Sequence, residues 1–197
     1  MSAACSLVPR TICASRFGRK RREAGHRWCR HGLAQPMRTC SMTYRISGLD
    51  PADFAHLVGK TDTELAGLGA VRMIADAKPG FPCRITLEDA EPGEALLLVN
   101  HVSHGAVGPY RASHAIFVRE GAGEAARYEA RIPPSLDTRI LSLRGFDGDG
   151  MMRDACLAHP GEADPSIRAM LANPAIDHID AHNATRGCFA ARIDRAG

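Results

Sequence analysis

The sequence predicts an α+β protein with a mainly antiparallel sheet of about nine strands, which could curl toward a barrel, and three short helices. Two observations support this fold class. Apolar and polar residues alternate over short segments, which is the period of a strand, and connections of hairpin length join most of those segments. The helix signals are few, and they do not alternate regularly with the strands, so a parallel sheet of βαβ units is not expected.

Nine segments have the composition or the alternation of a strand. They are Tyr44–Ser47, Val71–Ala75, Cys83–Leu87, Ala95–Val99, Ala115–Val118, Arg139–Phe146, Met151–Leu157 and the two strands of a hairpin within Ile176–Ile193. The segment Ala95–Val99 is apolar throughout, which is typical of a central strand buried on both faces. The DGDG sequence that begins at Asp147 is typical of a hairpin turn, because an EF-hand calcium loop would need a glycine where Met152 stands and an acidic residue at Ala158.

Capping residues predict the starts of the three helices. Asp50 followed by Pro51 is an N-cap with proline at the first helical position, and Asp164-Pro165 repeats that pattern near the end of the chain. The sequence TDTE at Thr61–Glu64 is a capping box, in which each of two side chains satisfies a free backbone N–H of the first turn. Gly69 is expected to end that second helix.

The charge distribution divides the chain near residue 42. Residues 1–41 contain nine Lys and Arg but only one acidic residue, Glu23. This part could be a disordered basic arm or an organellar transit peptide, but the favoured prediction is an upstream mis-start with Met42 or Met37 as the true initiator. Residues 42–197 are expected to form a single globular domain. That domain has no basic stripe for nucleic acid and no apolar run of membrane-spanning length, and its odd number of cysteines suggests reduced thiols and a cytoplasmic location.

The final hairpin concentrates unusual side chains on one strand face. Side chains alternate across a strand, so His178, Asp180 and His182 point the same way. An odd number of residues in the connecting loop would place the apolar residues of both strands together on the opposite face: Ile179, Ala181, Phe189 and Ile193. An even number would put Phe189 with the histidines, and so the pattern favours the odd loop. Two odd registers remain open, one with His182 opposite Cys188 and the other with Asp180 opposite Arg192.

This face contains the candidate catalytic residues. Cys188 could act as a nucleophile with His182 as its base, while Asp180 orients the imidazole. An ordinary solvated strand face would carry the same residue types, and the sequence alone leaves both interpretations open.

A second group of polar residues lies in the expected loop between Ala95–Val99 and Ala115–Val118. The candidate ligand-binding residues there are His104, Tyr110, Arg111 and His114, and the final hairpin adds Asn183 and Arg186. A guanidinium matches the geometry of a carboxylate or phosphate, so these residues predict a pocket for a small anionic ligand. The pair His101 and His104 has no carboxylate nearby in the sequence, and we therefore predict no metal site and no cofactor.

Three strings, PYRASHAIFVRE, ILSLRGFDGDGMM and HNATRGCFAARIDRA, occur in order along the chain. Together they are similar to a bacterial family known as domain of unknown function 1203, over Met42 to Gly197. The resemblance implies a small bacterial protein of unassigned activity, and it carries over no catalytic or binding residue. Two functions are therefore considered: a domain, which could be an enzyme, that binds a small anionic molecule, and a non-enzymatic protein-interaction or regulatory module.

Overall fold

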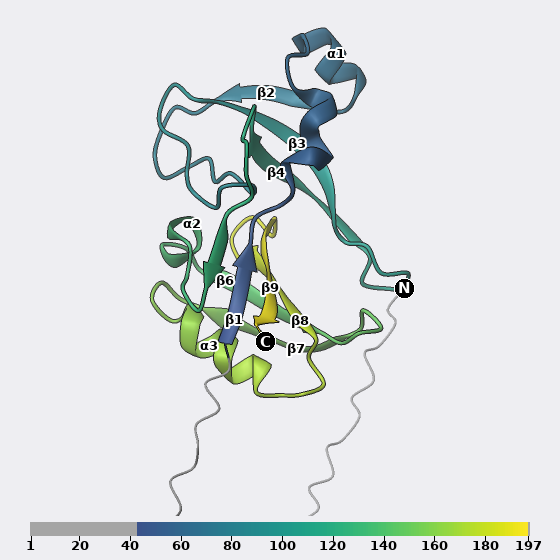
Figure 1. Ribbon diagram of the computed structural model, residues 1–197, viewed down its shortest axis with the longest axis vertical. Coiled ribbons are helices and arrows are strands. Elements are labelled where there is room, and N and C mark those ends of the chain that lie inside the picture. The colour runs from purple at the N-terminus through teal and green to yellow at the C-terminus, as the bar shows by residue number, and fades with distance from the viewer. Residues whose placement is uncertain (1–42, 197) are drawn as a thin grey trace, which may run out of the picture. The chain divides into compact units, whose positions relative to one another are not determined.

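The computed structural model describes residues 43–196 (Figure 1). The predicted arm of residues 1–41 lies outside this range, and its nature stays a prediction. The strands are β1 (Thr43–Ser47), β2 (Val71–Ile74), β3 (Ala95–His104), β4 (Ala112–Arg119), β5 (Arg127–Glu129), β6 (Leu141–Phe146), β7 (Met152–Ala158), β8 (His178–Asn183) and β9 (Phe189–Ala196). The helices are the 3₁₀ helix η1 (Pro51–Leu57) and the α-helices α1 (Asp62–Gly67), α2 (Pro134–Asp137) and α3 (Ala163–Leu171).

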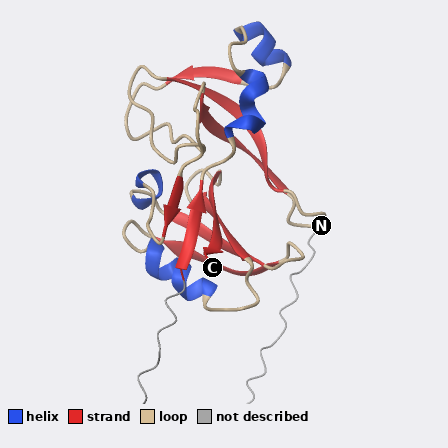
Figure 2. Cartoon of the chain, in the orientation of Figure 1, coloured by secondary structure: helices blue, strands red, loops and turns tan. Residues whose placement is uncertain are grey.

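The strands form two antiparallel sheets, which confirms the predicted α+β class (Figure 2). One sheet has six strands in the order β5-β1-β9-β8-β6-β7, and the other has three in the order β2-β3-β4. Neither sheet closes into a barrel within residues 43–196. None of the helices in this part of the chain is long and apolar enough to cross a membrane.

Each sheet buries its own apolar core. Ile167 of α3 packs with Leu143 and Ile179 of the six-stranded sheet, and all three side chains are fully buried. Leu65 of α1 packs in the second core with Leu97 and other residues of the three-stranded sheet. Burial of an amphipathic helix against a sheet face removes apolar surface from water, and this is the main stabilising contribution of such elements.

Two of the three predicted helix starts are confirmed. The Asp50 carboxylate accepts a hydrogen bond of 2.8 Å from the backbone N–H of Ala52 at the start of η1. At α1 the Thr61 hydroxyl accepts from the N–H of Glu64, while the Glu64 carboxylate accepts from the N–H of Thr61 at 2.8 Å. These hydrogen bonds satisfy backbone donors that the first helical turn leaves free.

The third predicted helix start is wrong at the cap. The helix α3 begins at Ala163 with Glu162 in the N-cap position, because the Asp164 carboxylate accepts from Tyr44 and Arg168 and caps no backbone N–H of the helix.

One predicted strand is absent from the structure, and one observed strand was not predicted. Cys83–Leu87 is not a strand, because the N–H of Leu87 bonds back to the carbonyl of Cys83 at 3.0 Å and Leu87 adopts a φ of 54°. Cys83 packs in the core of the three-stranded sheet and Leu87 in that of the six-stranded sheet, so packing against two cores overrides the local alternation. The short strand β5 was not predicted.

The expected loop between the two central strands is also much shorter than predicted. Pairing of β3 with β4 continues through His101 opposite His114 and reaches His104, so the connection comprises only residues 105–111. His104 and His114 therefore lie on strands, and only Tyr110 and Arg111 of the predicted loop residues lie in the connection.

The final hairpin forms as predicted, with a bulge that changes its register. Asp180 lies opposite Arg192, which is one of the two registers left open. Beyond this pair Ala190 has no partner, and His182 lies opposite Phe189 across an even-numbered connection. The odd loop was therefore the wrong prediction at the tip: Phe189 shares a face with the histidines and packs in the core of the three-stranded sheet. The physical reason is that a β-bulge shifts side-chain alternation by one residue, which lets the two ends of one strand face different cores.

Candidate functional site

A cavity of about 490 Å³ lies where the turn after residue 78 approaches the tip of the final hairpin. Its polar lining consists mainly of three arginines and two residues of the hairpin tip: Arg84, Arg139, Arg186, Asn183 and Cys188. Its apolar wall includes Leu98 of β3, Phe117 of β4 and Ile140. We call this cavity the arginine pocket.

Arg84 is the most unusual residue of the arginine pocket. Its side chain is only 2% exposed, yet no carboxylate of residues 43–196 forms an ion pair with it. The guanidinium donates instead to the carbonyl of Phe189 at 2.8 Å, to the carbonyl of Pro82, and to the sulfur of Cys188 at 3.2 Å. Burial lowers the pKa of Arg84 below its usual range, because removing the cation from water disfavours the charged form.

The other two arginines differ in how their charge is balanced. Arg139 forms a two-pronged ion pair with Asp89, with N–O distances of 2.6 and 2.9 Å. Arg186 is exposed at the hairpin tip and has no hydrogen-bond or ion-pair partner among the described residues. Of the three guanidiniums, Arg84 and Arg186 therefore have no carboxylate to neutralise them.

Two hydrogen bonds join Asn183 to Cys188 at the hairpin tip. The side-chain amide of Asn183 donates to the sulfur of Cys188 at 3.3 Å, and its backbone N–H donates to the Cys188 carbonyl at 3.0 Å. Together with Arg84, this gives the sulfur two hydrogen-bond donors. Cys188 is therefore fixed in position and partly accessible from the cavity.

The three predicted catalytic residues have separate partners. The Nδ1 atom of His182 donates to the carbonyl of Gly187 at 3.2 Å, and no hydrogen bond in the described part of the chain joins His182 to Cys188 or Asp180. Asp180 contacts His104 and His178 instead. Burial lowers the pKa of His182 to about 4, since the ring is nearly inaccessible to water.

The predicted ligand-binding residues separate into four places. Asn183 and Arg186 line the arginine pocket. His114 lies on β4 with its ring centroid 4.9 Å from that of His182, and its Nδ1 atom is 2.8 Å from the Ser103 hydroxyl. Arg111 does not line the arginine pocket; its exposed guanidinium donates to the carbonyl of Gly105 at 2.9 Å.

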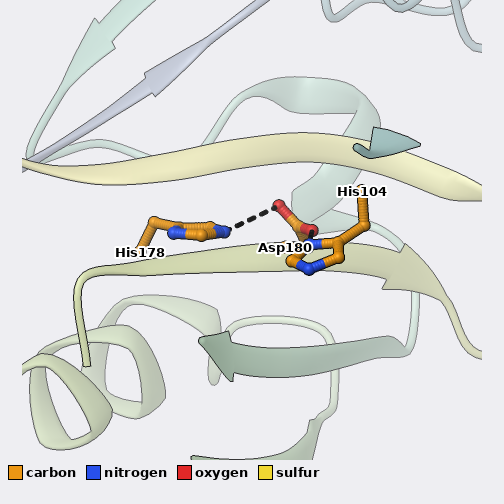
Figure 3. A group of neighbouring side chains, drawn as sticks. All are labelled: His104, His178 and Asp180. Carbon is orange, nitrogen blue, oxygen red and sulfur yellow. Dashed lines mark hydrogen bonds and ion pairs between the residues drawn. The ribbon is translucent and has the colours of Figure 1, made fainter. Parts of the chain in front are cut away.

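The other two predicted residues lie near Phe146. The ring of His104 stacks on that of Phe146 at a centroid distance of 4.1 Å, and Tyr110 approaches the same ring edge-on at 6.0 Å. His104 is also the first member of a buried group with His178 and Asp180, in which one ligand atom from each residue lies within 4.8 Å of the other two (Figure 3). We call this group the histidine cluster, and it contains the residues that could hold a metal ion.

Sequence reasoning missed Arg84, Arg139 and His178 as site residues. Arg84 was expected on a strand and Arg139 at the start of one, and no local signal distinguishes either residue from a surface arginine. His178 shared a strand face with Asp180 in the sequence, but His104, the residue that completes the cluster, lies more than seventy positions earlier.

The fold and the two sites define an α+β protein with two antiparallel sheets, an arginine-lined cavity and a buried histidine cluster. The family model described as protein of unknown function (DUF1203) matches residues 80–195, and the chain belongs to this family. The match includes all the lining residues of the arginine pocket and all three members of the histidine cluster. No curated protein and no solved structure matches the chain.

Proposed function

We propose that the protein binds a small organic anion, a carboxylate or a phosphate ester, in the arginine pocket. The observation that carries this proposal is Arg84, a buried cation that lines a cavity and has no carboxylate partner in the described part of the chain. A buried charge is costly unless it is paired, and an anionic ligand would provide the missing partner.

The mouth of the pocket adds a second cation. Arg186 is exposed and has no partner among residues 43–196, so its fork of N–H donors can bind an oxyanion. Arg139 contributes less, because Asp89 already neutralises it. Two unneutralised guanidiniums at one cavity favour a ligand with an anionic head.

The apolar wall suggests what the rest of the ligand is like. Leu98, Phe117 and Ile140 offer hydrocarbon and aromatic surface beside the arginines. Ligand cavities usually combine such a wall with a few polar groups that fix orientation. A carboxylic acid or phosphate ester that carries an apolar or aromatic body therefore fits better than inorganic phosphate.

The experiment is a thermal-shift and calorimetric comparison of aromatic and aliphatic acids, phosphate esters, and the neutral amides of the same acids. A ligand at 100 times its Kd stabilises the native state by about 2.7 kcal/mol, which is easily seen as a rise in melting temperature. We expect the acids to bind and the amides not to bind. Equal shifts by acids and amides would contradict the proposal.

Arg186→Gln tests where the anion binds. The Arg186 side chain has no partner in the described structure, so its loss should leave the fold intact. A hydrogen bond to a charged group contributes roughly 1.5–3 kcal/mol, which corresponds to about a 10- to 100-fold weaker Kd for the best acid. Arg127→Gln is the matched control, because Arg127 is also exposed but lies on β5, away from the pocket lining. Equal affinity in both variants would place the ligand elsewhere.

A further inference from the structure

The histidine cluster joins the end of β3 to the start of β8 inside the protein. His178 and Asp180 point the same way from β8, and His104 reaches them from β3 (Figure 3). The Nδ1 atom of His104 is 3.4 Å from Oδ2 of Asp180, and Nε2 of His178 is 4.0 Å from Oδ1 of the same carboxylate. All three residues are buried, and Asp180 is only 1% exposed.

The hydrogen bond from His104 to Gly150 determines the tautomer of the His104 ring, and so which nitrogen is an acceptor toward the Asp180 carboxylate. Its Nε2 atom is 3.1 Å from the carbonyl oxygen of Gly150, and because a carbonyl can only accept, Nε2 must carry the hydrogen. In the neutral ring Nδ1 then presents a lone pair to Asp180. Two acceptors facing each other in a buried site repel, unless a cation lies between them.

His178 has the same arrangement with its nitrogens exchanged. Its Nδ1 atom lies 3.2 Å from the Asp177 carboxylate, which accepts the hydrogen. Its Nε2 atom and Oδ1 of Asp180 are both buried and have no hydrogen-bond partner within the described structure. A buried polar atom without a partner costs about 1–3 kcal/mol, so two such atoms aimed toward one another need an explanation.

A proton on His104 explains only part of this geometry. An imidazolium ion at His104 would pair with Oδ2 of Asp180, but it would leave Oδ1 and the Nε2 atom of His178 unpaired. A second proton, on His178, would place two stacked cations, with ring centroids 6.0 Å apart, against one carboxylate.

We propose that His104, His178 and Asp180 bind a divalent transition-metal ion of the Zn²⁺ type. Two imidazoles and one carboxylate are ligands that Zn²⁺ and its neighbours prefer over Mg²⁺ and Ca²⁺. Each histidine also donates its other N–H to an oxygen, which is the usual outer hydrogen bond of a metal-binding histidine.

The distances suit such an ion after a small contraction. With metal–ligand bonds of about 2.0–2.1 Å, two ligands of a tetrahedral site lie roughly 3.4 Å apart. The pair formed by His104 and Asp180 already has this separation. The three ligand atoms lie within 4.8 Å of one another, so His178 must move inward by at most about 1.4 Å to reach it. His104 and His178 also line a cavity of about 220 Å³, which would leave a further coordination position open to water or a ligand.

The arrangement of the histidine cluster requires glycine at position 150. It adopts a φ of 77°, and a Cβ atom at this position would lie 2.3 Å from the Cβ of Ala106 and 3.1 Å from Nε2 of His104. Only glycine therefore lets the Gly150 carbonyl hold the His104 ring in the orientation that turns Nδ1 toward Asp180.

The test compares the full-length chain with Asp180→Asn, after both have been stripped of metal with a chelator. Zn²⁺ and Co²⁺ binding is measured by calorimetry, by the visible absorption of bound Co²⁺, and by the melting temperature. Loss of an outer hydrogen bond typically weakens metal binding about 10–100-fold, and loss of a direct ligand should weaken it at least as much. We expect Zn²⁺ to raise the melting temperature of the natural chain, Mg²⁺ and Ca²⁺ to leave it unchanged, and Asp180→Asn to lose the Zn²⁺ effect.

The cysteines and histidines of residues 1–41 are present in both chains, so any metal that they bind cancels in the comparison. His159→Gln is the matched control, since His159 is exposed and lies outside the cluster. It should bind Zn²⁺ as the natural chain does. If the natural chain and Asp180→Asn bind Zn²⁺ with equal affinity and stoichiometry, the proposal is wrong.

A second variant covers the case in which Asp180→Asn does not fold. The Asp177 side chain is 60% exposed, so Asp177→Asn should leave the fold intact while weakening the outer hydrogen bond to His178. We expect Zn²⁺ to bind this variant about tenfold more weakly. If Asp180→Asn cannot be measured and Asp177→Asn binds Zn²⁺ with the affinity of the natural chain, the proposal is overturned.

Discussion

Replacement of Arg139 by Met tests whether the buried ion pair beside the arginine pocket holds the fold. Asp89 is 7% exposed, and its carboxylate accepts three hydrogen bonds. Two come from the Arg139 guanidinium and one, of 3.1 Å, from the backbone N–H of Gly80. In Arg139→Met the carboxylate keeps only the bond from Gly80. Removal of one partner of a buried pair typically costs about 3–5 kcal/mol, because the remaining charge is left uncompensated.

This cost should be visible in the thermal and denaturant transitions. For a chain of 150–250 residues, each kcal/mol shifts the melting temperature by about 2–4 °C, so Arg139→Met should melt roughly 6–20 °C lower. Urea unfolding should show a lower midpoint with an unchanged slope. The matched control is Arg45→Met, which breaks the ion pair with Glu129 on the protein surface and should cost less than about 1 kcal/mol.

A double variant separates the charge from the packing. In Asp89→Asn with Arg139→Met the buried group is neutral and its side-chain oxygen can still accept from Gly80. The double variant should therefore be more stable than Arg139→Met alone, although we expect Asp89→Asn by itself to destabilise the protein. The reasoning from an uncompensated buried carboxylate is refuted by either of two results. One is that Arg139→Met loses no more stability than Arg45→Met, and the other is that the double variant is no more stable than Arg139→Met.

Two further predictions concern close packing and thiol access. Gly48→Ala should destabilise the protein by about 3 kcal/mol or more, because the new Cβ would lie 1.9 Å from the carbonyl oxygen of Ile85, which is backbone and cannot move aside cheaply. Gly67→Ala, where the new Cβ would meet no atom within 4 Å beyond its chain neighbours and its own helix backbone, is the control in urea unfolding and should be neutral or slightly stabilising; equal losses would contradict the packing argument. In timed alkylation with peptide mapping, Cys188 should react faster than Cys83, since Cys188 lines the cavity and Cys83 is fully buried; the reverse order would mean that the turn around Cys83 opens.

The sequence by itself determined the features that depend on near neighbours. The capping box at Thr61 and the N-cap at Asp50 involve residues no more than three positions apart, so their hydrogen bonds could be predicted without a fold. The α+β class and the final hairpin also followed from short-range alternation and turn residues. Of the arginine pocket, the part predicted from sequence was the hairpin tip with Asn183 and Arg186.

Only the tertiary structure decided how distant segments complete each site. Arg84 became a buried cation because residues 83–87 turn between two cores, and the local pattern had indicated a strand. The bulge at Ala190 sent Phe189 to the core opposite the one that alternation predicted. His104 meets Asp180 across 76 positions of sequence, since β3 is longer than its apolar segment suggests. Such contacts depend on the packing of whole sheets, and local propensity does not encode that packing.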